Sequence, residues 1–307
     1  MNSISLHRGG FYWAMVLLLI EISCSNSRQG SMLQGDTTDN EIMNSLPARR
    51  LLTYWNDFNF DGRVLVVNSD YAEQKLVDFI ILFPTVPDTV VRVAIHNMLK
   101  KAAAEPKTFT YFLDKYSHYL YSPNSPMRNE GYYELVLIYL AGDETLSDEQ
   151  RSHYTTLLKH VRKNQVRTMA ADFEFLAKDG KYRRMHAGTK PYKMLVFYDP
   201  TCTHCAAVML DLAQTPVVIN CIENGFLDVV SVSLHPDRGS WMGYQKRIPD
   251  SWINGWDEQG QVINNGLYNI RAYPSIFLLD EKNRVLLKDA PLDVTLRYLV
   301  NLTNEGN

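Results

Sequence analysis

The chain has 307 residues, of which 46% are hydrophobic and 21% charged; this is ordinary for a globular protein, excludes wholesale disorder and leaves room for two domains. The formal net charge is −3 at pH 7, from 31 basic and 34 acidic residues without a dense Lys/Arg run, so no nucleic-acid partner is expected. Four cysteines are too few for a disulfide framework in a chain of this length.

Residues 1–23 have the pattern of an export signal peptide. Arg8 precedes an apolar run of about ten residues, which has the length of a secretory hydrophobic region and is short for a membrane span. The segment that ends at Cys24 resembles a bacterial lipobox, in which Cys24 would be lipidated, although Glu21 stands where that pattern has an apolar residue. Cleavage after Ser25 would instead give a secreted protein without an anchor. Both alternatives place the protein outside the cytosol, where disulfides persist. The first expectation is a cell-envelope lipoprotein, either periplasm-facing or in the outer membrane, which its lipid ties to the membrane.

Residues 24–49 are polar and lack an apolar period, so we predict a flexible tether. Residues 50–163 contain about five stretches with helical apolar spacing, which predict a compact all-α domain. Asp70-x-x-Glu73 and Ser147-x-x-Gln150 have the spacing of capping boxes at helix starts. No catalytic constellation occurs in this domain, and its function is left open.

Residues 164–307 alternate strand and helix signals, which predict a mixed α/β sheet with helices on its faces. Asp179-Gly180 predicts the turn of an entry hairpin, and Pro216 predicts a kink between two helices. The expected strands are 195–198, 226–234, 275–279 and 285–288, and the expected helices are 206–214, 217–224 and 292–302.

Cys202-Thr203-His204-Cys205 follows an apolar strand-like run and precedes a helix-like one. This order places Cys202 at a helix N-terminus, where backbone N–H groups and the helix dipole favour a thiolate. A thiolate three residues from a second thiol can attack a disulfide and then be resolved by its neighbour. We therefore predict Cys202 as the nucleophile and Cys205 as the resolving thiol.

Two other interpretations of this motif are a structural disulfide and a zinc site. A disulfide across so short a loop stabilises a fold little. Tetrahedral zinc needs two more ligands, which no second C-x-x-C or paired histidine supplies, so neither a metal nor a cofactor is expected. Cys221 lies in an apolar segment that predicts a buried, unreactive thiol.

Three neighbours of the cysteines are candidates for tuning their reactivity. A cationic His204 would stabilise the Cys202 thiolate and favour the reduced dithiol, whereas a solvent-facing His204 would have little effect. Asp199 before Pro200 is either a substitute base or an Asx-type turn residue. Thr203 is expected to be a cap or a small spacer.

The segment 164–307 resembles the thioredoxin superfamily, specifically the extracytoplasmic TlpA-like thiol–disulfide oxidoreductases of bacteria. The resemblance rests on three spaced motifs: an entry hairpin at Ala171-Asp172-Phe173 and Asp179-Gly180-Lys181, the strand and motif from Phe197 to Cys205, and Tyr273-Pro274-Ser275-Ile276-Phe277. The helical segment resembles uncharacterised domains that precede such modules in envelope proteins.

This resemblance implies a thioredoxin fold with a cis peptide bond before Pro274, and a Tyr273-Pro274 edge that binds the substrate backbone opposite the cysteines. Val196 departs from the family, which has a buried aspartate at this position as a proton acceptor, so the source of general-base help is open. Trp241, Trp252 and Trp256 are expected to pack in a core, with a substrate groove as the alternative.

Together these patterns predict a thiol–disulfide oxidoreductase of the cell envelope, with protein thiols or disulfides as substrates and an upstream redox partner. The alternative is a non-catalytic thioredoxin-fold module in an envelope lipoprotein, in which the helical domain and the Tyr273 face bind a partner and the cysteines are incidental. The direction of electron flow is left open.

Overall fold

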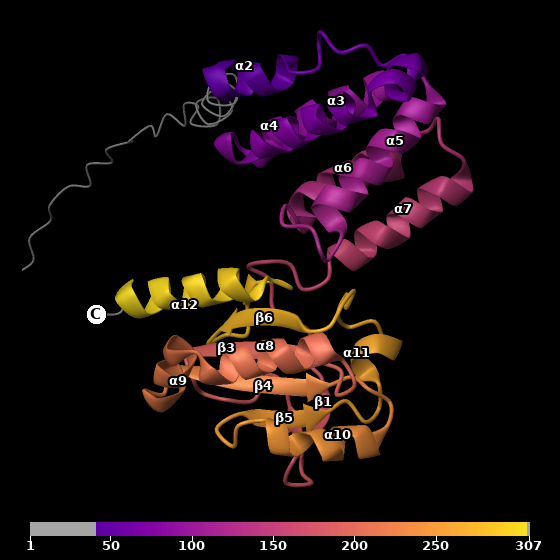
Figure 1. Cartoon of the computed structure of the whole chain (residues 1–307). Helices are drawn as coiled ribbons and strands as arrows, with labels where there is room; N and C mark the ends of the chain where they lie inside the picture. Colours follow the sequence, from indigo (N-terminus) through magenta and orange to yellow (C-terminus); the bar gives the residue numbers. More distant parts are fainter. Residues whose placement is uncertain (1–40, 306–307) are drawn as a thin grey trace, which may run out of the picture. The chain divides into compact units, whose positions relative to one another are not determined.

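The computed structural model describes residues 41–305, and those from residue 50 onward form one compact unit (Figure 1). The predicted signal peptide, Cys24 and most of the predicted tether lie outside the described residues. One boundary needs correction: the tether was expected to reach residue 49, whereas helix α2 begins at Leu46. Pro47 is compatible with the first turn of this helix, because backbone N–H groups in that turn have no hydrogen-bond partner within the helix. The side chain of Leu51, one turn later, is buried.

The N-terminal part of this unit is helical, as predicted. Its elements are α2 (Leu46–Thr53), α3 (Gly62–Ile81), η1 (Phe83–Thr85), α4 (Asp88–Ala102), α5 (Pro106–Tyr116), η2 (Ser117–Tyr121), α6 (Glu130–Gly142) and α7 (Asp148–Val161). An aromatic cluster forms part of its core, in which the ring of Trp55 lies 5.5 Å from that of Phe79 and 5.4 Å from that of Phe112. Such ring pairs add to the stabilisation from burial alone.

The two predicted capping boxes have different outcomes. Ser147 and Gln150 form both hydrogen bonds of a capping box at the start of α7. The box at Asp70 is wrong, because the apolar run before it continues the helix and α3 begins at Gly62. Glu73 instead accepts a hydrogen bond from the Tyr119 hydroxyl at 2.6 Å and pairs with Lys115, which ties α3 to α5 and η2.

The C-terminal part is built on a seven-stranded mixed sheet with the order β2-β1-β5-β4-β3-β6-β7, in which β4 is parallel to both β3 and β5. The strands are β1 (Glu174–Ala177), β2 (Tyr182–Arg184), β3 (Tyr192–Tyr198), β4 (Leu227–Ser233), β5 (Ile253–Trp256), β6 (Ser275–Asp280) and β7 (Val285–Leu287). The helices are α8 (Thr203–Gln214), α9 (Pro216–Glu223), α10 (Arg238–Tyr244), η3 (Gln245–Arg247), α11 (Gln261–Asn264) and α12 (Leu292–Glu305).

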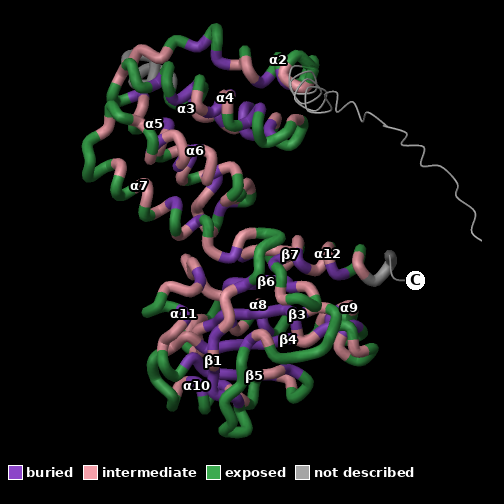
Figure 2. The backbone as a smooth tube through the Cα atoms, turned by 180° about the vertical axis from the view of Figure 1, so that it is seen from behind, coloured by how far each residue is buried: buried purple, intermediate pink, exposed green. Residues whose placement is uncertain are grey.

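Helices α8, α9, α10 and α12 contribute side chains to the core on one face of this sheet, and the short α11 and the loops before β1 and after β2 contribute to the core on the other. The central strands are therefore buried on both sides (Figures 1 and 2). Along β3, Val196 and Tyr198 belong to one apolar core, whereas Leu195 and Phe197 belong to a second core on the other face. This explains why the strand is a continuous apolar run rather than an alternating one. The three tryptophans at 241, 252 and 256 are buried in the first core, as expected.

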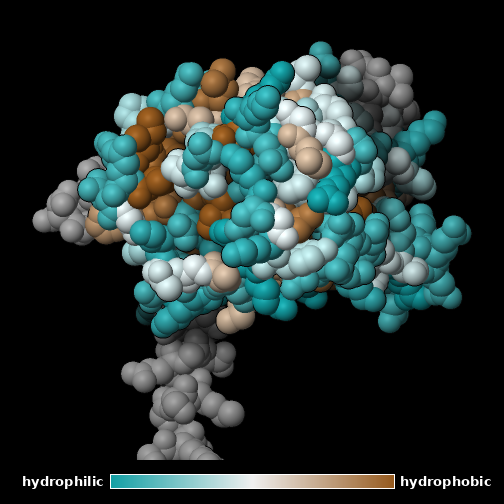
Figure 3. Space-filling view, turned by 90° about the horizontal axis from the view of Figure 1, so that it is seen from below, coloured by the Kyte–Doolittle hydropathy of each residue, from teal (hydrophilic) through white to brown (hydrophobic). Residues whose placement is uncertain are grey.

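Pro216 divides the predicted kinked helix into α8 and α9, whose axes differ by 60°. Within the described residues no single helix is long and apolar enough to cross a membrane. The bent pair of α8 and α9, taken together, reaches that length and apolar composition, and this is the extent of its likeness to a membrane span. In the view of Figure 3 most of the surface is hydrophilic, and apolar side chains form small groups among polar ones.

Candidate redox site

The Cys202 side chain lies where β3 ends and α8 begins. After Tyr198 the chain turns through Asp199, whose Oδ1 accepts hydrogen bonds from the Thr201 backbone N–H and the Thr201 hydroxyl, each at 2.7 Å. The Cys202 N–H donates to the Asp199 carbonyl at 3.1 Å. Asp199 therefore has the geometry of the turn residue, which is one of the two interpretations that its sequence position allowed.

Cys202 is the N-cap residue of α8. Its Sγ accepts a hydrogen bond from the backbone N–H of Cys205 at 3.1 Å, as an N-cap side chain does for the third helical residue. This N–H and the helix dipole both favour negative charge on the sulfur. The Cys202 side chain is half-buried, and Thr203 and His204 are exposed on the first turn of α8, so any charge on His204 faces solvent.

Cys205 lies in a different environment, although it is three residues away. Its side chain has no exposed surface and packs in the same apolar core as Val196 and Tyr198. Burial raises the pKa of the Cys205 thiol, and the hydrogen bond and negative charge of the neighbouring Cys202 sulfur raise it further. Cys202 is therefore the accessible sulfur, and Cys205 is held behind it as a protonated thiol.

The loop before β6 faces the sulfur of Cys202. The Tyr273–Pro274 peptide bond is cis, and the Tyr273 carbonyl oxygen lies 3.9 Å from Cys202 Sγ. β6 pairs antiparallel with β3, which brings the loop before β6 next to the carboxyl end of β3, where the cysteine motif follows. Tyr273 also lines a cavity of about 350 Å³ together with Leu234 and Ile263. The predicted residues Cys202, Tyr273 and Pro274 are thus brought together.

No carboxylate occupies the position of Val196, which is fully buried among apolar side chains. Within residues 41–305, no group of three or more His, Cys, Asp or Glu side chains is arranged to hold a metal ion. Cys221 is buried in α9, and this burial raises the pKa of its thiol, in agreement with the predicted inert role.

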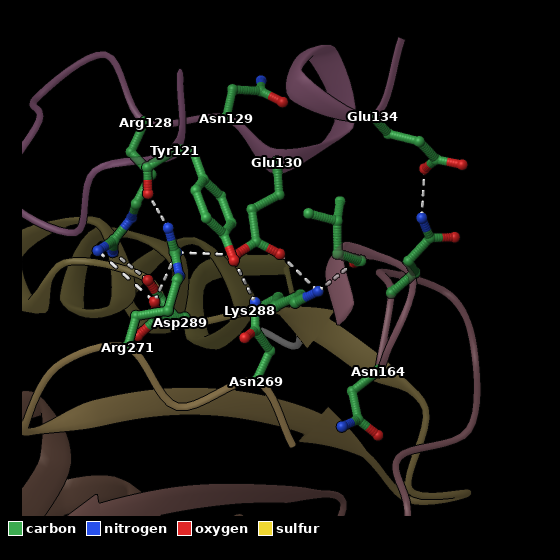
Figure 4. A network of polar contacts seen from close by, with 12 residues as sticks. Tyr121, Arg128, Asn129, Glu130, Glu134, Asn164, Asn269, Arg271, Lys288 and Asp289 are labelled. Carbon is green, nitrogen blue, oxygen red and sulfur yellow. Dashed lines mark hydrogen bonds and ion pairs between the residues drawn. The ribbon is translucent and has the colours of Figure 1, made fainter. Parts of the chain in front are cut away.

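Sequence reasoning missed Arg271, two residues before Tyr273, which the structure connects to the helical part of the chain through a network of buried polar contacts (Figure 4). A charged residue in the loop two positions before the Tyr-Pro dipeptide is the signal in the sequence that points to it.

Comparison with known proteins gives matches for both parts of the chain. Residues 51–164 match the family described as a domain of unknown function, DUF5106. No curated protein matches the chain. A solved thioredoxin-like protein from Bacteroides caccae is 28% identical, and the match covers 84% of this chain and 95% of that one with a TM-score of 0.79.

Two further solved structures match less than half of this chain. A conserved protein of unknown function from Bacteroides fragilis is 36% identical over 44% of this chain and 98% of that one, with a TM-score of 0.43. A domain of a possible thiol-disulfide isomerase from Cytophaga hutchinsonii is 19% identical over 47% of this chain and 97% of that one, with a TM-score of 0.42.

The match to the Bacteroides caccae protein covers more of this chain than either part alone, so it includes both the helical part and the sheet. The mixed sheet, the cysteine motif at the start of α8 and the cis proline opposite it agree with this similarity. The part of the chain after residue 164 therefore has a thioredoxin-like fold, and it follows residues 51–164, which match the DUF5106 family and are called the DUF5106 domain below.

Proposed function

We propose that this chain is a thiol–disulfide oxidoreductase of the bacterial cell envelope, which exchanges disulfides with protein substrates through Cys202 and Cys205. One observation carries the proposal: Cys202 Sγ accepts the Cys205 N–H at 3.1 Å and faces the Tyr273 carbonyl at 3.9 Å, beside a cis proline. This arrangement gives an activated sulfur and an adjacent backbone edge for an extended substrate.

The reaction begins when the Cys202 thiolate attacks one sulfur of a substrate disulfide. The substrate S–S bond breaks, a mixed disulfide forms at Cys202, and the departing thiolate takes up a proton. Cys205 then loses its proton and attacks the Cys202 sulfur, which releases the second substrate thiol. The substrate gains two electrons and two protons, and the Cys202–Cys205 dithiol becomes a disulfide that a dithiol donor reduces again. The reverse sequence oxidises a substrate dithiol.

Protein substrates are proposed because the site offers backbone recognition as well as a sulfur. Tyr273 is half-buried beside Cys202, and its carbonyl can accept a hydrogen bond from the backbone of an extended segment. A cysteine in such a segment would then be held with its sulfur near that of Cys202, which lowers the barrier through orientation.

The experiment is reduction of insulin with dithiothreitol as the electron donor, for the wild type and for the Cys202→Ala and Cys205→Ala variants. We expect the wild type to precipitate insulin well above the rate with dithiothreitol alone, and both variants to fall to that background. Wild-type activity no higher than that of the variants would end the proposal.

The envelope location and the lipid anchor are proposed from residues 1–24 alone. For the full chain expressed in a bacterial host, we expect to find the wild type in the membrane fraction. We expect the Cys24→Ser variant to be absent from that fraction. Equal membrane association of the wild type and this variant would contradict lipidation at Cys24.

A further inference from the structure

The DUF5106 domain contacts the loop that carries Tyr273 and Pro274 through two earlier residues of that loop, Asn269 and Arg271 (Figure 4). The first contact is made by Arg271. Its guanidinium donates to the Tyr121 carbonyl oxygen and lies over the Tyr121 ring, with 4.3 Å between Cζ and the ring centroid. Nη2 of the same side chain pairs with Glu130 Oε1 at 2.7 Å. Tyr121 and Glu130 both belong to the helical domain.

A second contact from the same loop reaches the same tyrosine. Asn269 Nδ2 donates to the Tyr121 hydroxyl at 3.1 Å, and the Tyr121 ring stacks on Tyr133 with centroids 4.7 Å apart and planes 14° apart. Tyr121 is thereby fixed from both sides. We call Tyr121, Glu130, Asn269 and Arg271 the loop clamp.

The loop clamp is largely shielded from water. The side chain of Arg271 is 10% exposed and that of Glu130 is 12% exposed. Ion pairs that are shielded from water are stronger than exposed ones. Loss of Arg271 would remove one of the two cations that pair with Glu130 and would leave Lys288 as the other. Arg271 also pairs with Asp289 at 3.0 Å, so its guanidinium is held in one orientation.

We propose that Arg271 is a positioning residue through which the DUF5106 domain holds the Tyr273-Pro274 edge at the distance from Cys202 that a protein disulfide requires. This inference rests on the proposed function. Only Ala272 separates Arg271 from Tyr273, so a shift at the clamp is transmitted to the Tyr273 carbonyl, which lies 3.9 Å from Cys202 Sγ. A protein substrate that pairs with this carbonyl depends on its position, whereas a small disulfide needs only the Cys202 sulfur.

Lys288 provides a matched control. Its ammonium pairs with the other oxygen of Glu130, Oε2, at 2.6 Å, and its side chain is 8% exposed. It therefore resembles Arg271 in burial and in its partner, but it follows β7 and lies outside the loop before β6. Loss of Lys288 disturbs the same interface without releasing the loop.

The experiment compares the wild type with Arg271→Gln and Lys288→Gln on two substrates. These are insulin, measured as kcat/KM, and 5,5′-dithiobis(2-nitrobenzoate), measured as the rate of its reaction with the reduced protein. For Arg271→Gln we expect kcat/KM for insulin to fall about tenfold while the small-disulfide rate stays within about twofold, since misplacement of a positioning group acts on oriented substrates. For Lys288→Gln we expect both to stay within about twofold of the wild type.

If Arg271→Gln does not fold, Glu130→Gln takes its place. We expect it likewise to lower kcat/KM for insulin while leaving the rate with the small disulfide nearly unchanged. An equal loss on both substrates, or the same split in Lys288→Gln, would overturn the inference.

Amide hydrogen exchange of residues 269–273 separates this inference from the proposed function. We expect faster exchange there in Arg271→Gln than in the wild type, and no change in Lys288→Gln. Unchanged exchange in Arg271→Gln overturns the inference, whatever the enzyme assay gives. A wild type that does not reduce insulin above the Cys202→Ala background overturns the proposed function instead.

Discussion

The two cysteines of the motif differ because one caps a helix and the other lies inside it. Cys202 at the N-cap accepts a backbone N–H and keeps part of its surface exposed. Cys205, one turn later, points into the apolar core beneath β3. The first position stabilises a thiolate and the second disfavours one. This asymmetry supports the proposed roles, with attack by Cys202 and resolution by Cys205.

The raised pKa of Cys205 makes the second step of the reaction pH-dependent. Below that pKa the thiolate fraction rises about tenfold per pH unit, so resolution should accelerate about a hundredfold between about pH 6 and about pH 8. Stopped-flow release of the second thionitrobenzoate from the Cys202 adduct measures this step. A Cys221→Ser control should give the same profile, because Cys221 is buried in α9. A second phase that does not change with pH would show that Cys205 is already ionised.

The sequence predicts Cys202 and Cys205 as the reacting sulfurs, but it does not predict the residues that hold them and the Tyr273 loop in place. The cysteine motif and Tyr273-Pro274 are local patterns, and the structure brings them together. The sequence allowed Asp199 to be either a substitute base or a turn residue, and in the structure its side chain accepts a hydrogen bond from Thr201 in a turn. Arg271 could not be assigned from its surroundings, because its partner Tyr121 is 150 residues away in the chain.

Among the elements, β5 is the strand that sequence patterning did not predict. Its residues Ile253-Asn254-Gly255-Trp256 include two poor strand formers. They are extended because β4 pairs with this segment on one side and β1 on the other. Gly255 is required there, since a Cβ atom at this position would lie 2.1 Å from Cδ2 of the buried Phe175 ring. Long-range pairing thus overrides local propensity in this strand.

Gly255→Ala should therefore destabilise the fold by about 3 kcal/mol, because the phenyl ring and two paired strands must move to admit one methyl group. The measurement is the free energy of unfolding in urea. Gly243→Ala is the matched control, since a Cβ atom there meets nothing within 4 Å and Gly243 lies in α10. We expect that control to be neutral or stabilising by up to about 1 kcal/mol. Equal effects of the two substitutions would contradict this account of β5.

Over the whole molecule, the DUF5106 domain and the thioredoxin fold share buried charges. Glu130 of α6 pairs with Arg271 and Lys288, and Arg128 donates to the Asp289 carbonyl and pairs with its side chain at 3.6 Å. The separate fold classes were predictable from helical and strand periodicity, which is a local property. The contact between the two parts was not, because its charged residues look like ordinary surface residues in the sequence.

These shared charges predict that both parts unfold together. Separation would break these shielded ion pairs and the hydrogen bonds beside them, so either part alone would lose stabilisation that the intact chain has. Scanning calorimetry of the wild type should give one transition, with equal calorimetric and van't Hoff enthalpies. Arg271→Gln should split this transition into two, or should raise the ratio of the calorimetric to the van't Hoff enthalpy above one. Two separate transitions in the wild type would show that the domains are energetically independent.

We propose that Cys202 and Cys205 form a reversible redox pair. The most direct test is equilibration of the protein in glutathione buffers of graded ratio, followed by acid quenching, maleimide labelling and mass measurement. We predict a single two-electron transition with one disulfide per chain and a midpoint between about −270 and about −120 mV, which disappears in Cys202→Ala. A pair that stays fully reduced, or a disulfide that glutathione cannot open, would contradict the claim.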